Sequence, residues 1–149
     1  MTEATEPSTD AQALATAAID AMYARDEASR ALGIEVVSVE PGRAVTRMTV
    51  RPDMVNGLDV CHGGLIFTLA DSAMAFASNS YNHYDISTHA DIDWLQPAHR
   101  GDVLTATATN AARQGRNAVH DVAVVNAAGG LVATFRGRTR RIEGTHVAR

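Results

Sequence analysis

The stretch CHGGLIFTLAD, residues 61–71, leads into one of the most apolar segments of the chain and ends on a carboxylate. From residue 63 to about residue 79, apolar side chains surround the axis of a predicted helix, which is typical of a helix in a protein interior. Burial of Asp71 there is costly unless the carboxylate has a partner, and it raises the pKa. The segment predicts a central helix and makes Asp71 a candidate site residue.

The sequence on either side predicts one more helix and six strands. Helix formers run from a cap at about Asp10 to a stop at Gly33. Two β-branched runs then flank Pro41-Gly42, a pair that suits a type II turn in a hairpin. After the central helix, strands are predicted at about 86–95, 102–113, 117–126 and 130–142.

This order of elements is typical of an α+β domain. A single antiparallel sheet curved around one central apolar helix explains why that helix needs no polar face, and this architecture is the hotdog fold. Such a sheet leaves its other side or its edges for contacts between subunits. We expect one domain over residues 10–144, with a flexible tail at 1–9 and a short tail at 145–149.

The composition excludes several classes of function. The chain has 149 residues, 46% of them hydrophobic, and a formal net charge of −4, which indicates one domain without a basic surface for nucleic acid or membrane. All 13 basic residues are Arg, so a Schiff-base lysine is impossible. We expect partners to be small molecules and other copies of the chain.

The single Cys61 cannot form an internal disulfide, and the acidic N-terminal sequence lacks the features of a secretory signal. A cytoplasmic location is expected. The histidines other than His62 show no paired spacing typical of metal ligands; they are His83, His89, His99, His120 and His146. We expect no metal.

Three separated motifs carry a family resemblance: VNGLDVCHGGLIFTLADSAMAFASNS, DIDWLQPAHRGDVLTATA and VATFRGRTRRIEG. In this order they resemble the PaaI-type hotdog thioesterases of phenylacetate breakdown, over about residues 32–144. The resemblance implies hydrolysis of phenylacetyl or hydroxyphenylacetyl coenzyme A thioesters in a homotetramer built from hotdog dimers. Coenzyme A is then part of the substrate, and no separate cofactor is expected.

Gly63 and Gly64 lie at the predicted helix start, where backbone N–H groups are unpaired and the helix dipole favours negative charge. Glycine also lets a ligand approach the backbone closely. The resemblance implies that the Gly63 N–H polarises the thioester carbonyl, with Gly64 as a binding residue beside it. The alternative is a tight turn packed under the sheet.

Asp71 has two candidate catalytic roles: a general base that activates water, or a nucleophile that forms a mixed anhydride with the acyl group. The sequence does not choose between them. The alternative is a structural carboxylate that is held by Ser72 or by the backbone of a strand.

Asn56 and His62 lie in and after the loop that precedes the helix. Asn56 could orient the attacking water or hold the substrate carbonyl, although Asn-Gly is also a common turn pair. His62 could bind near the thioester or hold the loop. A Cys61–His62 catalytic pair is disfavoured, because such residues normally meet across the fold and not along the chain.

Eight residues separate Gly63 from Asp71, or about 12 Å along a helix, which is too far for both to act on one carbonyl. If two central helices lie side by side and antiparallel, Asp71 of one chain approaches Gly63 of the other. The spacing therefore predicts an active site across a dimer interface, with two equivalent sites in each symmetric dimer.

Arg136 and Arg138, with Arg140, share one face of a strand if alternation holds. Because coenzyme A carries a pyrophosphate and a ribose phosphate, this row could bind the substrate. A solvated strand face or an intersubunit row of ion pairs would use the same arginines.

Two alternative functions remain at this stage. A hotdog hydratase or dehydratase pairs a catalytic His with a carboxylate to move protons at the acyl β-carbon, and that pairing is not evident here. A non-catalytic module would bind acyl-CoA without turnover, and the intact Asp71 argues against it.

Overall fold

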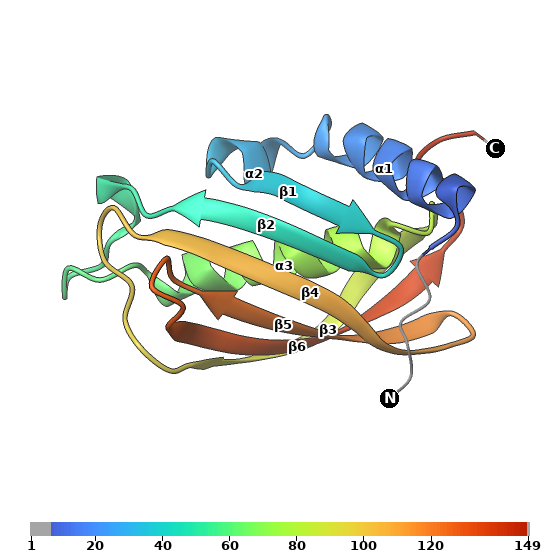
Figure 1. The fold of residues 1–149 in the computed structure, drawn as a ribbon. Helices are drawn as coiled ribbons and strands as arrows, with labels where there is room; N and C mark the ends of the chain where they lie inside the picture. The colour runs from blue at the N-terminus through green and yellow to red at the C-terminus, as the bar shows by residue number, and fades with distance from the viewer. Residues whose placement is uncertain (1–6, 149) are drawn as a thin grey trace.

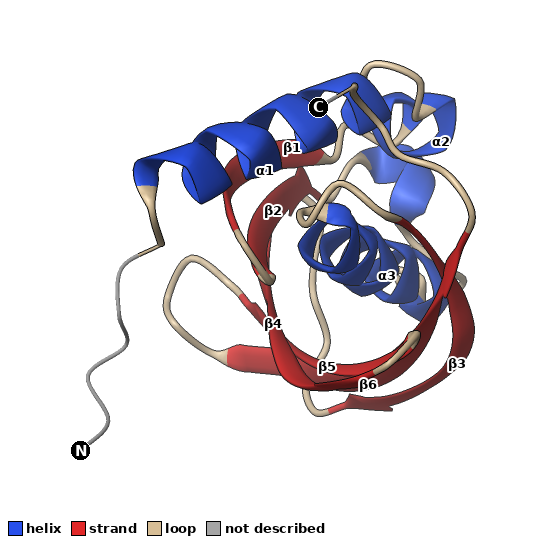
Figure 2. Ribbon diagram, turned by 90° about the vertical axis from the view of Figure 1, so that its right-hand side faces the viewer, coloured by secondary structure: helices blue, strands red, loops and turns tan. Residues whose placement is uncertain are grey.

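A computed structural model of the chain describes residues 7–148. Its elements are α1 (Thr9–Tyr23), α2 (Glu27–Ala31), β1 (Glu35–Glu40), β2 (Arg43–Thr49), the one-turn 3-10 helix η1 (Pro52–Met54), α3 (Gly63–Asn79), β3 (Tyr84–Trp94), β4 (Val103–Gln114), β5 (Asn117–Val125) and β6 (Leu131–Ile142). The expected hotdog fold is confirmed: the sheet curves around α3 (Figure 1; Figure 2). The observed central helix has the predicted bounds.

The sheet has the strand order β1-β2-β4-β5-β6-β3, and every neighbouring pair is antiparallel. The inner face is lined by small and apolar side chains, which lets the sheet approach α3 closely. Gly137 on β6 shows how closely, because a side chain at that position would collide with Met74 of α3. Met74 and Phe76 are fully buried in this core.

The N-terminal helix differs from the prediction. Ser8, not Asp10, caps α1 by accepting a hydrogen bond from the Ala11 N–H, and the helix breaks before Asp26. Asp26 accepts from both the N–H and the hydroxyl of Ser29, and so starts the separate helix α2. Gly33 follows α2 with a φ of +68°, as expected of a helix stop.

The structure describes part of each predicted tail. At the N-terminus Ser8 caps α1 and Thr9 is its first residue, while residues 1–6 lie outside the described residues. Near the C-terminus, the N–H groups of His146 and Val147 both donate to the Asn82 side chain at 3.0 Å. The His146 ring also packs edge-on against Tyr84, with 4.7 Å between ring centroids, so this segment is part of the domain.

The two edges of the sheet differ. At the β1 edge the Gln12 side chain of α1 donates to the Val39 carbonyl at 2.8 Å, and the Tyr23 hydroxyl donates to the Ile34 carbonyl at 2.7 Å. Figure 2 shows α1 lying along β1. At the other edge β3 exposes about half of the Ile86 and Trp94 side chains. Of the two edges, β3 is the one left open to another chain.

One buried ion pair ties β3 to β4. The Asp85 carboxylate is fully buried, accepts from Arg113 at 2.8 Å and from the Ser78 hydroxyl at 2.7 Å, and lies 4.0 Å from Arg141. The pair at Asp121 and Arg136 is bidentate and shorter, at 2.6 and 2.8 Å, but it is exposed. A comparison of the two pairs therefore separates the contribution of burial to stability from that of hydrogen-bond geometry.

Asp85→Ala is expected to lower the free energy of unfolding by about 2 kcal/mol, because it leaves the Arg113 charge and the Ser78 hydroxyl without their buried partner. Asp121→Ala is the matched control and should cost no more than about 1 kcal/mol, because water and salt screen an exposed pair. Urea unfolding of both variants checks this. Equal losses would show that burial does not set the energy of these pairs.

Candidate active site

The loop before α3 is held by backbone hydrogen bonds that position the first residue of the helix, Gly63. The N–H of Cys61 donates to Ala98 and that of His62 donates to Met54, both at 2.8 Å. His62 caps α3, because its Nδ1 accepts from the Gly64 N–H at 3.0 Å. Within residues 7–148, the Gly63 N–H has no hydrogen-bond partner. It is therefore available to a ligand at the positive end of the α3 dipole.

His62 has the loop-holding contact that was one of its two predicted roles. An Nδ1 that accepts a hydrogen bond carries no proton, so a neutral imidazole keeps its hydrogen on Nε2. The cap thus leaves only the Nε2–H of His62 to face a substrate.

Asp71 is half-buried on α3 and contacts β3. The Ser87 hydroxyl donates to its Oδ1 at 3.2 Å, whereas Ser72 pairs with Ser29 instead. Burial raises the pKa of the Asp71 carboxyl, and the hydrogen bond from Ser87 lowers it in part. The predicted structural alternative through Ser72 is wrong.

α3 lies in the interior, as expected of an apolar helix, but one protomer does not cover it on all sides. A stripe along α3 is at least partly exposed in the protomer and consists of Gly64, Thr68, Asp71 and Ala75. These positions are three or four residues apart and so share one face of the helix. The sheet and the N-terminal helices enclose the other faces, so that Asp71 lies on the open side of α3, next to β3.

Asn56 holds a turn with its side-chain oxygen, and its side-chain nitrogen is not needed for the turn. Its Oδ1 accepts from the N–H groups of Leu58 at 2.9 Å and Val60 at 3.4 Å, which closes the loop. Among the described residues its Nδ2 makes no hydrogen bond. The turn and the substrate contact are therefore compatible, because they use different atoms of the amide.

Two cavities flank the start of α3, each of about 350 Å³. The first is lined by Val60, Cys61, Gly63, Ile66 and residues 94–98, and the second by Asp53, Met54, Val55, His62, Gly64 and Leu65. Their volumes are in the range of small-molecule sites. Gly63 thus lines one mostly apolar space, and its neighbours His62 and Gly64 line the other.

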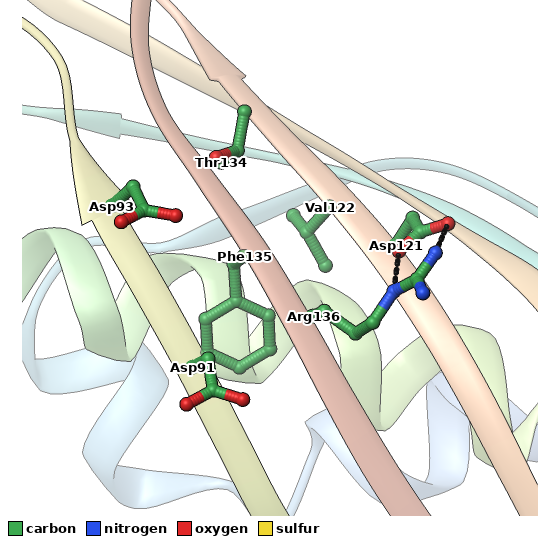
Figure 3. Close-up of a pocket in the computed structure, with 7 residues that line it drawn as sticks. All are labelled: Asp91, Asp93, Asp121, Val122, Thr134, Phe135 and Arg136. Carbon is green, nitrogen blue, oxygen red and sulfur yellow. Dashed lines mark hydrogen bonds and ion pairs between the residues drawn. The ribbon is translucent and has the colours of Figure 1, made fainter.

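Arg136 and Arg138 share the outer face of β6, as predicted, but Arg136 is already paired. Figure 3 shows its guanidinium bound to Asp121 in a cavity of about 320 Å³ that Asp91 and Asp93 also line. Three carboxylates there make a poor site for a phosphate. Arg138 lies opposite His89 and is exposed, without an ion pair among the described residues.

One functional candidate, Ser87, could not be found from the sequence, and the contact made by a second, Trp94, could not be foreseen. Ser87 contacts Asp71 and lies beside an irregularity in the β3–β6 register, between Ser87 and His89, which no local pattern marks. From the sequence, Trp94 is expected to line an acyl pocket or to lie in the core or an interface, and in the structure its indole donates to the Gly63 carbonyl at 3.2 Å.

No group of three or more His, Cys, Asp or Glu side chains in residues 7–148 is arranged to hold a metal ion. In the same part of the chain, every helix is too short or too polar to cross a membrane.

A free N–H at the start of a helix enclosed by a curved sheet is the arrangement of a hotdog thioester hydrolase, and residues 58–133 match the family model of the Thioesterase superfamily. The chain belongs to this superfamily and is a thioester hydrolase. Among its relatives is the acyl-coenzyme A thioesterase PaaI of Escherichia coli K12, which is 44% identical over 125 residues, or 84% of this chain and 89% of that protein.

Solved structures agree with this assignment. The E. coli PaaI protein from the phenylacetic acid degradation operon superposes with a TM-score of 0.88 at 42% identity, covering 90% of this chain and 97% of that one. The protein smu.793 of Streptococcus mutans, solved with acetyl CoA bound, gives a TM-score of 0.72 at 25% identity, covering 75% and 90% of the two chains. The predicted family resemblance is confirmed.

Proposed function

We propose that the protein hydrolyses arylacetyl coenzyme A thioesters, such as phenylacetyl-CoA and its hydroxylated forms, to the free acid and CoA. The observation that carries the proposal is the unpaired Gly63 N–H at the start of α3. A donor fixed at this place stabilises the oxyanion that forms when a thioester carbonyl is attacked. The name of the E. coli relative supports coenzyme A as the thiol, and its operon supports an arylacetyl substrate in phenylacetate breakdown.

The site is proposed to form between two protomers. Gly63 and Asp71 lie in one continuous helix about 12 Å apart, so one chain does not offer both to the same carbonyl. The open β3 edge and the partly exposed stripe of α3 adjoin each other and give a second copy a surface to pair with. Twofold pairing there would bring Asp71 of one protomer toward Gly63 of its partner. Association of two such dimers into a homotetramer stays a prediction.

The reaction then divides between the protomers. The Gly63 N–H binds the carbonyl oxygen as it becomes an oxyanion, and Asp71 on the other protomer accepts a proton from the attacking water. Collapse of the tetrahedral intermediate breaks the C–S bond and releases CoA as its thiolate. In the second route the Asp71 carboxylate attacks the carbonyl itself, and water then cleaves the mixed anhydride. A single turnover in ¹⁸O-water that leaves label in Asp71 identifies the second route, because only water attack on the aspartyl carbonyl of the anhydride transfers the water oxygen to the enzyme.

Other residues support these steps. The free Nδ2 of Asn56 is proposed to contact the substrate carbonyl or the water, and the Nε2–H of His62 is proposed to lie near the thioester. Arg138 is a better candidate than Arg136 for a CoA phosphate, because Arg136 is neutralised by Asp121. A cytoplasmic location and the absence of a cofactor stay predictions.

The test is steady-state release of CoA, followed with a thiol reagent, on phenylacetyl-, hydroxyphenylacetyl- and medium-chain acyl-CoA. The expected result is the highest kcat/KM for the two arylacetyl substrates. Faster cleavage of the medium-chain substrate would overturn the arylacetyl assignment. Two further results would replace hydrolysis altogether: ultraviolet absorbance of an enoyl product would identify a dehydratase, and saturable binding without turnover would identify a binding module.

A further inference from the structure

Trp94 is the only tryptophan of the chain and the last residue of β3. Its indole Nε1–H donates to the Gly63 carbonyl oxygen at 3.2 Å. The ring also packs against the Gly63 α-carbon, because a Cβ added there would lie only 3.1 Å from the indole Nε1 and Cε2. Trp94 thus makes both a polar and an apolar contact with the residue that has the free N–H.

The peptide group that joins Gly63 to Gly64 is held at both of its polar atoms. Its carbonyl oxygen accepts from Trp94, and its N–H donates to Nδ1 of His62. A peptide between two glycines at the end of a helix is restrained less than others, because glycine has the widest range of backbone conformations. The preceding peptide, to which the free Gly63 N–H belongs, is joined to this one through Gly63, so holding one peptide restricts the orientations of the other.

The same ring is a wall of the first cavity described above. Trp94 and Leu95 lie on one side of this space, and Val60 and Ile66 lie on others. More than half of the Trp94 side chain is exposed at the open edge of the sheet, at 52%. A large flat apolar ring beside a cavity suits an aromatic group of a ligand, through stacked or edge-on contacts.

We propose that Trp94 is a positioning residue that aims the Gly63 N–H at the thioester carbonyl and forms the wall of the pocket that receives an aromatic acyl group. This inference rests on the proposed thioesterase activity and names the acyl side of its site. Tryptophan suits both tasks because it combines a flat ring with an N–H donor, whereas phenylalanine lacks the donor.

Two substitutions separate these tasks. Trp94→Phe keeps a ring against Gly63 and removes the donor, so kcat for phenylacetyl-CoA should fall about 5-fold while KM changes little. Trp94→Leu also removes the ring, so KM for phenylacetyl-CoA should rise about 10-fold, with KM for acetyl-CoA unchanged. Val37→Ala is the control, because Val37 is a half-exposed residue on β1 at the opposite edge of the sheet. It should match wild type.

Analytical ultracentrifugation of each variant measures the fraction of dimer. This control is needed because Trp94 lies at the β3 edge, where the second copy is proposed to pair. Activity losses that persist in a fully dimeric sample support the inference. Wild-type kinetics in Trp94→Phe would overturn the positioning role, as would losses that higher protein concentration reverses. Equal changes in KM for acetyl-CoA and phenylacetyl-CoA would overturn the role as an acyl wall.

A direct readout uses the fluorescence of this single tryptophan. The probe is a phenylacetyl-CoA analogue in which a methylene replaces the thioester sulfur, so that hydrolysis is impossible. Saturable binding should shift the emission to shorter wavelength as the ring loses water, and free CoA should not. If wild type hydrolyses thioesters but the analogue binds without a change in emission, the inference fails and the proposed function stands. If wild type hydrolyses no thioester, the proposed function fails and the inference falls with it.

Discussion

Asp71→Asn is expected to lower kcat for thioester hydrolysis at least about 100-fold, or roughly 2.7 kcal/mol of transition-state stabilisation. The substitution keeps the shape of the side chain, so the contact with Ser87 on β3 is preserved in outline. It removes the charge that both proposed routes need, since an amide neither accepts the proton of water nor attacks a carbonyl. Stopped-flow release of CoA from phenylacetyl-CoA measures the loss.

Stability distinguishes lost chemistry from lost structure. Burial raises the pKa of the Asp71 carboxyl, so the folded state binds its proton more tightly than the unfolded state does. The charged carboxylate therefore lowers the free energy of unfolding. This loss begins as pH rises through the ordinary pKa of an aspartate, and it is complete above the raised pKa of the folded state. Asp71→Asn should therefore unfold at the same temperature as wild type or higher at pH 7. A clear fall in Tm would indicate that Asp71 is structural.

The same shift in pKa predicts the pH profile of wild type. Activity that depends on the carboxylate should fall as pH is lowered through the raised pKa, so the acidic limb of kcat/KM should lie above the usual range of an aspartate. Ser87→Ala removes the hydrogen bond that lowers this pKa. It should move the acidic limb further upward.

Gly63→Pro is expected to lower kcat by about 100-fold, because it removes the one N–H proposed to bind the oxyanion. Proline suits this position: Gly63 is the first residue of α3, and His62 before it has a φ of −57° and a ψ of 126°, which a following proline allows. Gly63→Ala is the matched control. It adds the same Cβ against Trp94 but keeps the N–H, so the difference between the two variants isolates the donor.

Mixing these two inactive variants tests whether the site is formed by both protomers. In a mixed dimer of Asp71→Asn and Gly63→Pro chains, one site has both defects and the other has neither. Random exchange of subunits should restore about a quarter of wild-type activity, because half of the dimers are mixed and each has one intact site. If both groups acted from one chain, every site would keep one defect, and mixing would restore nothing.

The central elements of the fold could be predicted because their signals are local. The Gly63-Gly64 pair marks the start of α3, and Pro41-Gly42 forms the turn between β1 and β2, where Gly42 has a φ of +78°. The break between α1 and α2 could not be predicted in the same way. The segment is rich in helix formers throughout, yet α1 ends at Tyr23 and a second helix starts where the Asp26 side chain accepts from the Ser29 N–H.

The site was predictable where one residue carries the signal. Asp71 and Gly63 stand out because a carboxylate in an apolar helix and paired glycines at its start are unusual. Their partners are distant in sequence: Ser87 lies 16 residues from Asp71, and Trp94 lies 31 residues from Gly63. These contacts depend on the path of β3 around α3 and on its irregular register, which local patterns do not encode.

The hydrogen bond from Gln12 to Val39 also has a consequence for how many copies can join. A sheet with two uncovered edge strands can pair with another chain at both edges, and repeated pairing gives an open-ended filament. Because α1 occupies the β1 edge, each protomer offers one bare edge, and pairing two of these uses up the unpaired backbone groups on both. We therefore expect growth along the sheet direction to stop at two copies. In that arrangement the N-terminal helix would prevent the sheets from joining into open-ended fibres.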